Sequence, residues 1–143
     1  MALNSLSSFL YGFEVTPNNS SIDFQVVSLG PTLQATLTLG FYSLTGLLAE
    51  VSRALQAVDN TNTYTATADR TIAGGTQNRV TIASSGAFFR LLFASGPRTA
   101  STSAPLLGYT TTDKTGATSY TGQTSAGTYL IPNPVVPRLP GYS

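Results

Sequence analysis

The side chains that could carry out catalysis are few in this chain. Only 13 of its 143 residues are charged, and it contains no histidine and no cysteine. Imidazole and thiolate groups are the most common general bases, nucleophiles and soft metal ligands, so most routes to catalysis are closed. Lys114 is the only lysine that could activate a serine. The sequence therefore predicts that the protein is not an enzyme and has no catalytic, cofactor-binding or metal-binding residues.

One type of acid chemistry stays open as an alternative. Glycoside hydrolysis requires two carboxyl groups on either side of the scissile bond. Candidates for such a pair are Asp23, Asp59, Asp69 and Asp113. No spacing in the sequence favours one pair over another, and Asp113-Lys114-Thr115-Gly116 is expected to form a turn.

Composition favours contact with other proteins. The net charge is +1, charged residues make up 9%, and the chain contains 22 threonines and 16 serines. A typical domain has about 25% charged residues, and a net charge near zero promotes association. The seven basic residues are spread too evenly for a basic patch, so nucleic acid is not an expected partner. Neither a signal peptide nor a membrane span is expected, and no small-molecule substrate or cofactor.

Hydrophobic periodicity predicts one long amphipathic helix, at about residues 44–58. Its apolar residues recur with helical spacing on one face. We expect Ser43 or Thr45 to cap its start, and Asp59-Asn60 to end it. Glu50 and Arg53 are three residues apart and are expected on the solvent side.

Period-two alternation predicts strands at 22–26, 33–41 and 64–68. A hairpin is expected from 80–83 and 88–93, joined by the turn Ser84-Ser85-Gly86. The segment 103–108 is typical of a single helical turn that begins at Ser103 and is closed by Gly108 in the left-handed conformation. The phenylalanines of these strands are expected in the core, namely Phe24, Phe41, Phe88, Phe89 and Phe93. Four tyrosines are expected to be exposed or interfacial, namely Tyr109, Tyr120, Tyr129 and Tyr142.

These elements predict a β-rich α+β fold: a mainly antiparallel sheet or sandwich of about six or seven strands, with one packed helix and extended termini. Residues 1–20 form an N-terminal arm, 21–128 a single domain, and 129–143 a proline-rich extended C-terminal tail. Four prolines between 132 and 140 exclude a central strand there.

Because the tail is also apolar, we expect it to lie against a neighbouring subunit, with its own domain or disorder as alternatives. The expected subunit interface consists of apolar residues from both arms: Phe9, Leu10, Tyr11, Phe13, Tyr129, Leu130, Ile131, Val135, Val136, Leu139 and Tyr142.

The segment 64–122 resembles known viral proteins. It contains Tyr-Thr-Ala-Thr-Ala-Asp (64–69), Arg-Val-Thr-Ile (79–82), Phe-Arg-Leu-Leu-Phe-Ala-Ser-Gly (89–96), Leu-Leu-Gly-Tyr (106–109) and Asp-Lys-Thr-Gly-Ala-Thr-Ser-Tyr-Thr-Gly (113–122). Similar runs occur in structural proteins of tailed bacteriophages and some other double-stranded DNA viruses. The resemblance carries no catalytic residues.

The resemblance implies a non-enzymatic structural subunit of a virion, in the tail or baseplate rather than the head. Such a subunit would be assembled in the host cytoplasm, and its partners would be copies of itself and other virion proteins. Two alternatives remain: a module at a fibre tip that binds host-surface glycans through tyrosine, threonine and asparagine side chains, and a capsid decoration or head-completion protein.

Overall fold

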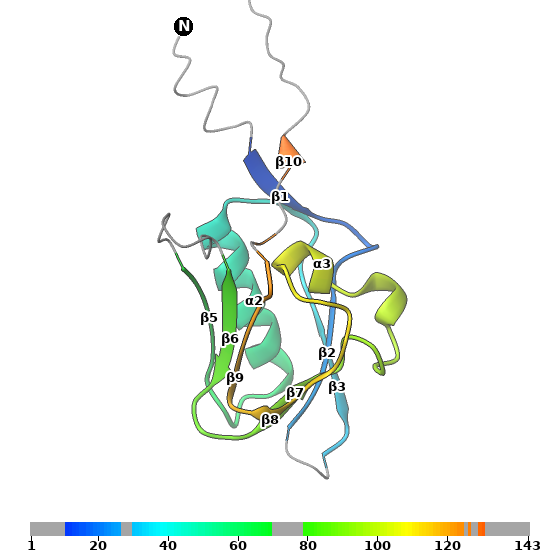
Figure 1. Cartoon of the computed structure of the whole chain (residues 1–143), viewed down its shortest axis with the longest axis vertical. Coiled ribbons are helices and arrows are strands. Elements are labelled where there is room, and N and C mark those ends of the chain that lie inside the picture. Colours follow the sequence, from blue (N-terminus) through cyan, green and yellow to red (C-terminus); the bar gives the residue numbers. More distant parts are fainter. Residues whose placement is uncertain (1–10, 27–29, 70–78, 125, 127–128, 131–143) are drawn as a thin grey trace, which may run out of the picture.

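The structure, a computed structural model, describes residues 11–26, 30–69, 79–124, 126 and 129–130 (Figure 1). The elements of the described residues are β1 (Tyr11–Val15), β2 (Ser21–Val26), β3 (Thr32–Thr36), β4 (Gly40–Tyr42), α2 (Leu44–Val58), β5 (Tyr64–Ala68), β6 (Val80–Ser84), β7 (Phe89–Leu91), the 3₁₀ turn η2 (Thr99–Ser101), α3 (Ala104–Leu107), β8 (Lys114–Ala117), β9 (Ser119–Thr121) and β10 (Tyr129–Leu130).

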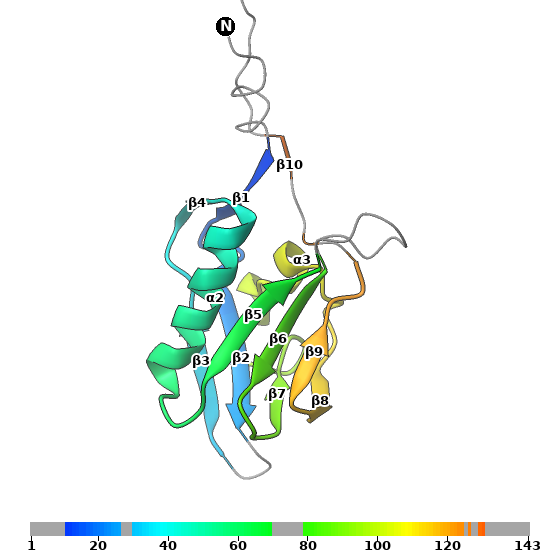
Figure 2. The same ribbon diagram turned by 90° about the vertical axis from the view of Figure 1, so that its left-hand side faces the viewer.

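The strands of the described residues form three antiparallel sheets, in the orders β3–β2–β7–β8, β5–β6–β9 and β10–β1–β4. The first two sheets face each other across the core (Figure 2). Strands β8 and β9 follow each other with only Thr118 between them, so the chain passes directly from one sheet to the other. The predicted β-rich α+β fold is confirmed.

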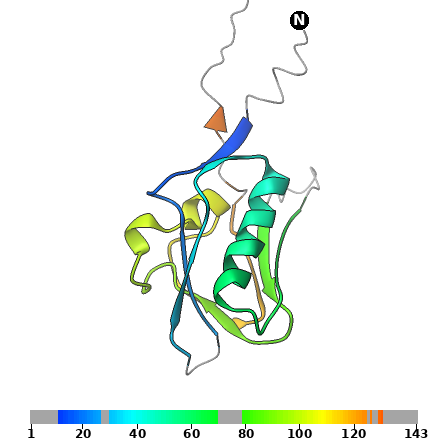
Figure 3. The same ribbon diagram turned by 180° about the vertical axis from the view of Figure 1, so that it is seen from behind.

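Helix α2 fills the open side between the two sheets, where it packs against β3 and β5 (Figure 3). Its bounds match the predicted helix. The hydroxyl of Ser43 accepts a hydrogen bond from the N–H of Gly46 (3.1 Å), and Asp59 is the C-cap. Of the apolar residues with helical spacing, Leu47, Leu48, Val51 and Leu55 are buried, together with Ala54, whereas Val58 is exposed. Burial of such a stripe is the main source of helix stability in a folded domain.

Two strand predictions were wrong. The nine-residue strand at 33–41 is split, because β3 ends at Thr36 and β4 belongs to another sheet. The turn occurs at Gly40, whose φ of 149° favours glycine. The predicted hairpin also does not form, since β6 pairs with β5 and β9, whereas β7 pairs with β2 and β8.

The aromatic predictions were partly right. Phe24, Phe89 and Phe93 are buried, as expected. Phe41 and Phe88 are instead 63% and 61% exposed. Tyr109 was expected at the surface but is buried, and its hydroxyl donates to the carbonyl groups of Val80 (2.9 Å) and Tyr120 (2.6 Å).

The predicted helical turn is present as α3. Gly108 ends it with φ 83°, a left-handed conformation that glycine adopts without steric cost. Ser103 occupies the N-cap position, but its side chain makes no capping hydrogen bond.

We predict that Gly96→Ala destabilises the fold. A Cβ atom at this position would lie 2.6 Å from the carboxylate of Asp23 and 2.7 Å from the carbonyl oxygen of Leu92. Relieving such overlap typically costs about 1–3 kcal/mol. Urea unfolding measures the change. Gly86→Ala is the matched control, because nothing lies within 4 Å of its added Cβ. Equal stability of the two variants would contradict the close packing at Gly96.

Candidate functional site

The two ends of the described chain lie side by side. Strand β1 pairs with β10, with Tyr11 opposite Leu130 and Gly12 opposite Tyr129. Tyr11 and Leu130, the first and last described residues, are therefore neighbours at one end of the domain (Figure 1). We call the sheet β10–β1–β4 the terminal sheet.

The terminal sheet is bordered by exposed apolar residues. Leu39 is 54% exposed and Phe41 is 63% exposed. Phe41 lies on β4, opposite Glu14 of β1. We call Leu39 and Phe41 the terminal patch. Single exposed apolar residues are common on protein surfaces, but two of them close together at the β4 edge of the terminal sheet indicate a surface suited to contact with another molecule.

The structure places the predicted interface residues in three different situations. Phe13 is 3% exposed and belongs to the core of its own domain, so its side chain offers almost no surface to a neighbour. Tyr11, Tyr129 and Leu130 lie in the paired strands of the terminal sheet. The others lie outside the described residues, namely Phe9, Leu10, Ile131, Val135, Val136, Leu139 and Tyr142.

Sequence reasoning missed the terminal patch. Leu39 and Phe41 follow the same alternation as Leu33, Ala35 and Leu37, and that alternation was interpreted as a single half-buried strand. Period two tells which residues share a face, but it does not tell where the partner layer ends. Gly40, between the two exposed residues, was the one local signal of a break.

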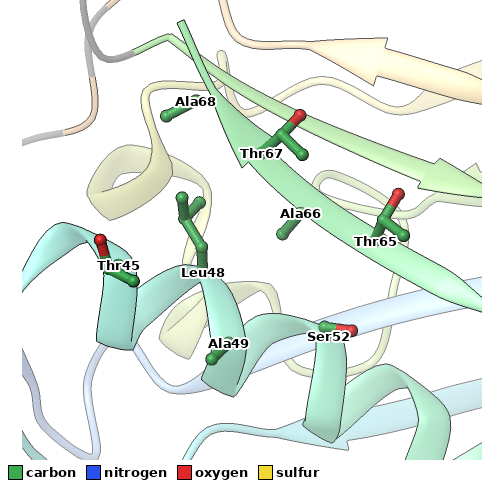
Figure 4. A pocket seen from close by; sticks show the side chains of 8 residues that line it. All are labelled: Thr45, Leu48, Ala49, Ser52, Thr65, Ala66, Thr67 and Ala68. Carbon is green, nitrogen blue, oxygen red and sulfur yellow. The ribbon is translucent and has the colours of Figure 1, made fainter. Parts of the chain in front are cut away.

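A groove of about 470 Å³ lies between α2 and β5 (Figure 4). Its lining is made of small or hydroxyl-bearing residues with a single leucine: Thr45, Leu48, Ala49, Ser52, Thr65, Ala66, Thr67 and Ala68. Side chains of Ala66 and Ala68 point toward α2, whereas those of Thr65 and Thr67 point away from it (Figure 4). None of the described residues that line it is charged, so this part of the groove suits an uncharged, largely apolar occupant.

Asp23, a candidate for acid chemistry, is buried in an ion pair. Its carboxylate lies 2.8 Å from a guanidinium nitrogen of Arg98, and it also accepts the backbone N–H of Arg98 at 2.7 Å. The same guanidinium donates to the hydroxyl of Thr36 and the carbonyl of Ala35, both at 2.8 Å. Asp23 thus joins β2 and β3 to the segment that precedes η2.

Asp59 closes the end of α2. Its carboxylate accepts hydrogen bonds from the N–H and hydroxyl of Thr61, the amide of Asn62 and the phenol of Tyr64, at 2.6–3.1 Å. Burial raises the pKa of Asp59, but the hydrogen bonds from Thr61, Tyr64 and Asn62 outweigh it and lower the pKa to about 2. Burial, together with the Asp59 carboxylate, raises the pKa of Tyr64.

The carboxylates of Asp113 and Glu50 also accept hydrogen bonds from other parts of the domain. Asp113 accepts the N–H groups of Ala94 and Ser95. Burial raises the pKa of Asp113, but hydrogen bonds from Ser95 and Ala94 outweigh that effect and lower the pKa.

Glu50 is buried rather than on the solvent side as predicted, because its carboxylate bonds Arg53 and accepts the N–H of Thr38. The hydrogen bond from Arg53 lowers the pKa of Glu50, although burial opposes it.

In the part of the chain that the structure describes, no group of three or more acidic side chains could hold a metal ion. Nor is any helix there long and apolar enough to span a bilayer. The carboxylates of Asp23, Asp59 and Asp113 each complete local structure instead of converging on one cleft.

Comparison with known proteins gives no assignment, because no family model and no curated protein matches the chain.

We predict that Asp59 makes stability depend on pH between about 4 and 2. Its pKa is 3.8 in an unfolded chain and about 2 in the fold, so its contribution is complete above the first value and disappears as pH falls through the second. Asp59→Asn should lower the free energy of unfolding by about 2 kcal/mol at pH 7. The difference from the unmodified protein should shrink toward pH 2 in urea titrations. A difference that stays constant from pH 7 to pH 2 would refute this role.

Proposed function

We propose that this protein is a non-enzymatic structural subunit of a tailed-phage virion, in the tail or baseplate. Copies assemble by symmetric contacts that use the terminal segments and the terminal patch. The observation that carries the proposal is the pairing of β1 with β10, which brings the two ends of the described chain together in the sheet whose other edge strand, β4, carries exposed Phe41, with exposed Leu39 next to it. The resemblance of residues 64–122 to phage structural proteins supports the same conclusion.

The terminal segments are large enough for this role. Ten residues precede β1 and thirteen follow β10, and both segments contain several large apolar side chains. If a segment buries on the order of 400 Å² on a neighbour, the gross gain is about 10 kcal/mol at about 25 cal/mol/Å². Loss of rotational, translational and chain freedom offsets part of this gain. In a closed ring each copy makes the same contact, so the net gain in free energy is repeated once for every copy.

The low charge of the surface fits repeated contact between identical copies. Identical subunits with strong net charge repel one another, whereas a net charge of +1 gives almost no repulsion. Contacts built from apolar and hydroxyl groups also depend little on salt, because few charges are available for screening.

We predict that the segment after Thr128 is required for self-association. The full chain should form a discrete oligomer, and a chain that ends at Thr128 should be a folded monomer. Light scattering after size exclusion measures the mass of each, and circular dichroism checks that the shortened chain keeps its β-rich fold. A full chain that stays monomeric at high concentration, alone and with both ends intact, would contradict symmetric self-assembly.

We predict that Phe41→Ser weakens the oligomer and leaves the fold of the subunit intact, because the ring is mostly exposed and lies next to the terminal sheet. Phe88→Ser is the matched control. Phe88 is almost equally exposed, but it lies in the connection between β6 and β7, at the opposite end of the domain (Figure 2). Sedimentation velocity compares the two variants. Equal loss of association in both would argue that the terminal patch has no special role.

A further inference from the structure

One edge of β5 carries unpaired backbone groups. In an antiparallel ladder, alternate residues direct their N–H and C=O groups to the same side. The N–H of Asp69 bonds the carbonyl of Arg79 (3.0 Å), so the odd-numbered residues of β5 face β6. Tyr64 faces the other way, toward α2, and by alternation so do Ala66 and Ala68.

Among the described hydrogen bonds, those between α2 and this edge of β5 are made at Tyr64. Ser52 donates its hydroxyl to the carbonyl of Tyr64 (2.5 Å), and the side-chain oxygen of Gln56 accepts the N–H of Tyr64 (2.7 Å). Among the described residues, no strand pairs with this edge and no side chain bonds the edge groups of Ala66 or Ala68. The groove between α2 and β5 begins where this coverage stops.

Another edge of the fold is protected differently. At the outer edge of β3, the guanidinium of Arg53 bonds the carbonyl of Thr36 (3.3 Å), and the carboxylate of Glu50 accepts the N–H of Thr38 just after the strand (2.7 Å). Charged side chains at a sheet edge prevent pairing with a foreign strand. The described residues that line the groove beside β5 include no such charge. The open edge of β5 is therefore suited to the addition of a strand.

The residues that follow β10 form a sequence that can pair on one side only. Pro132 and Pro134 are two positions apart, so their missing N–H groups fall on the same edge of an extended chain. The N–H groups of Ile131, Asn133 and Val135 fall on the opposite edge. A segment of this kind can donate hydrogen bonds to one neighbouring strand and cannot accept a second partner through its proline edge.

Strand direction favours a groove on another copy. Strand β1 leads into the core, where Phe13 and Val15 are buried, and β10 is antiparallel to it. The chain at Leu130 is therefore directed away from its own domain. The five residues 131–135 span only about 17 Å when extended, which leaves little length for a reversal.

We infer that residues 131–135 of one copy add as a strand to the edge of β5 at Ala66–Ala68 on a second copy, within the groove beside α2. This inference rests on the proposed function and deepens it, because it names the acceptor surface of the terminal segment. The occupant supplies backbone hydrogen bonds to Ala66 and Ala68 and places uncharged side chains in an uncharged groove.

Engineered disulfides test the inference in the full-length chain, which has no cysteine of its own. A Thr67→Cys chain is mixed with chains that each carry one cysteine at positions 131 to 135. Side chains on one face of adjacent strands lie about 5 Å apart, within disulfide reach. Cross-linked dimers should therefore form at alternate positions of the segment. Thr121→Cys, on the outer strand β9, is the matched control and should show no such alternation.

Three other outcomes would each overturn the inference. Disulfides that form only when one chain carries both Thr67→Cys and a cysteine at positions 131 to 135 would show that the segment occupies the groove of its own copy. An intact oligomer without alternating cross-links would place the segment elsewhere and leave the proposed function standing. A full chain that neither associates nor cross-links would contradict both the inference and the proposed function.

Ala66→Pro provides a second measurement. It removes the N–H that faces the groove and keeps the bonds of Thr65 and Thr67 toward β6. Association should weaken roughly tenfold, the effect of about one lost hydrogen bond. Ala66→Ser keeps the N–H and should associate like the unmodified chain. Unchanged association of a folded Ala66→Pro variant, verified by its thermal transition, would overturn the inference.

Discussion

Tyr64 holds α2 and the two facing sheets together. Its buried ring packs edge-on against Phe24 of β2 and Phe89 of β7, with centroids 5.6 and 5.7 Å away, so it joins the sheet of β5 to the facing sheet. Its hydroxyl bonds Asp59 at the end of α2, and its backbone bonds two side chains of that helix. Aromatic pairs in this geometry stabilise a core beyond their buried area. The described hydrogen bonds between α2 and the edge of β5 are at Tyr64, and the groove extends from there along Ala66 and Ala68.

Several of the charged side chains bond groups of the fold itself. Asp23 and Arg98 connect strands, Glu50 and Arg53 join α2 to the segment after β3, and Asp113 holds the turn after β7. Buried charges need partners, and a paired carboxylate that loses its partner costs several kcal/mol. These acids are therefore constrained by the fold, and the surface is left to threonine, serine and scattered apolar residues. Such a surface offers few features for binding a charged ligand and few obstacles to close contact between copies.

Local signals in the sequence were sufficient for α2 and α3. Apolar spacing, a capping serine, the Asp59 end and the glycine at 108 act within a few residues, so these predictions were confirmed. Errors arose where the partner is distant in sequence. Burial of Glu50 depends on the N–H of Thr38, and exposure of Phe41 depends on β1, neither of which periodicity can reveal. The placement of β6 and β7 in different sheets depends on β9 and β8, whose threonine-rich segments have no strong strand pattern. The groove arises from the angle between α2 and β5, a tertiary property without a motif.

The ion pair of Asp23 and Arg98 also has a consequence for synthesis of the chain. The two residues are 75 positions apart, and the pairing of β2 with β7 spans nearly as many. At about 5–20 residues per second, roughly 4–15 s pass between the addition of Asp23 and that of Arg98 by the ribosome. During that interval β2 cannot be buried without isolating a carboxylate, so the early strands stay in contact with water. The nascent chain thus completes this sheet only after Arg98 has been translated.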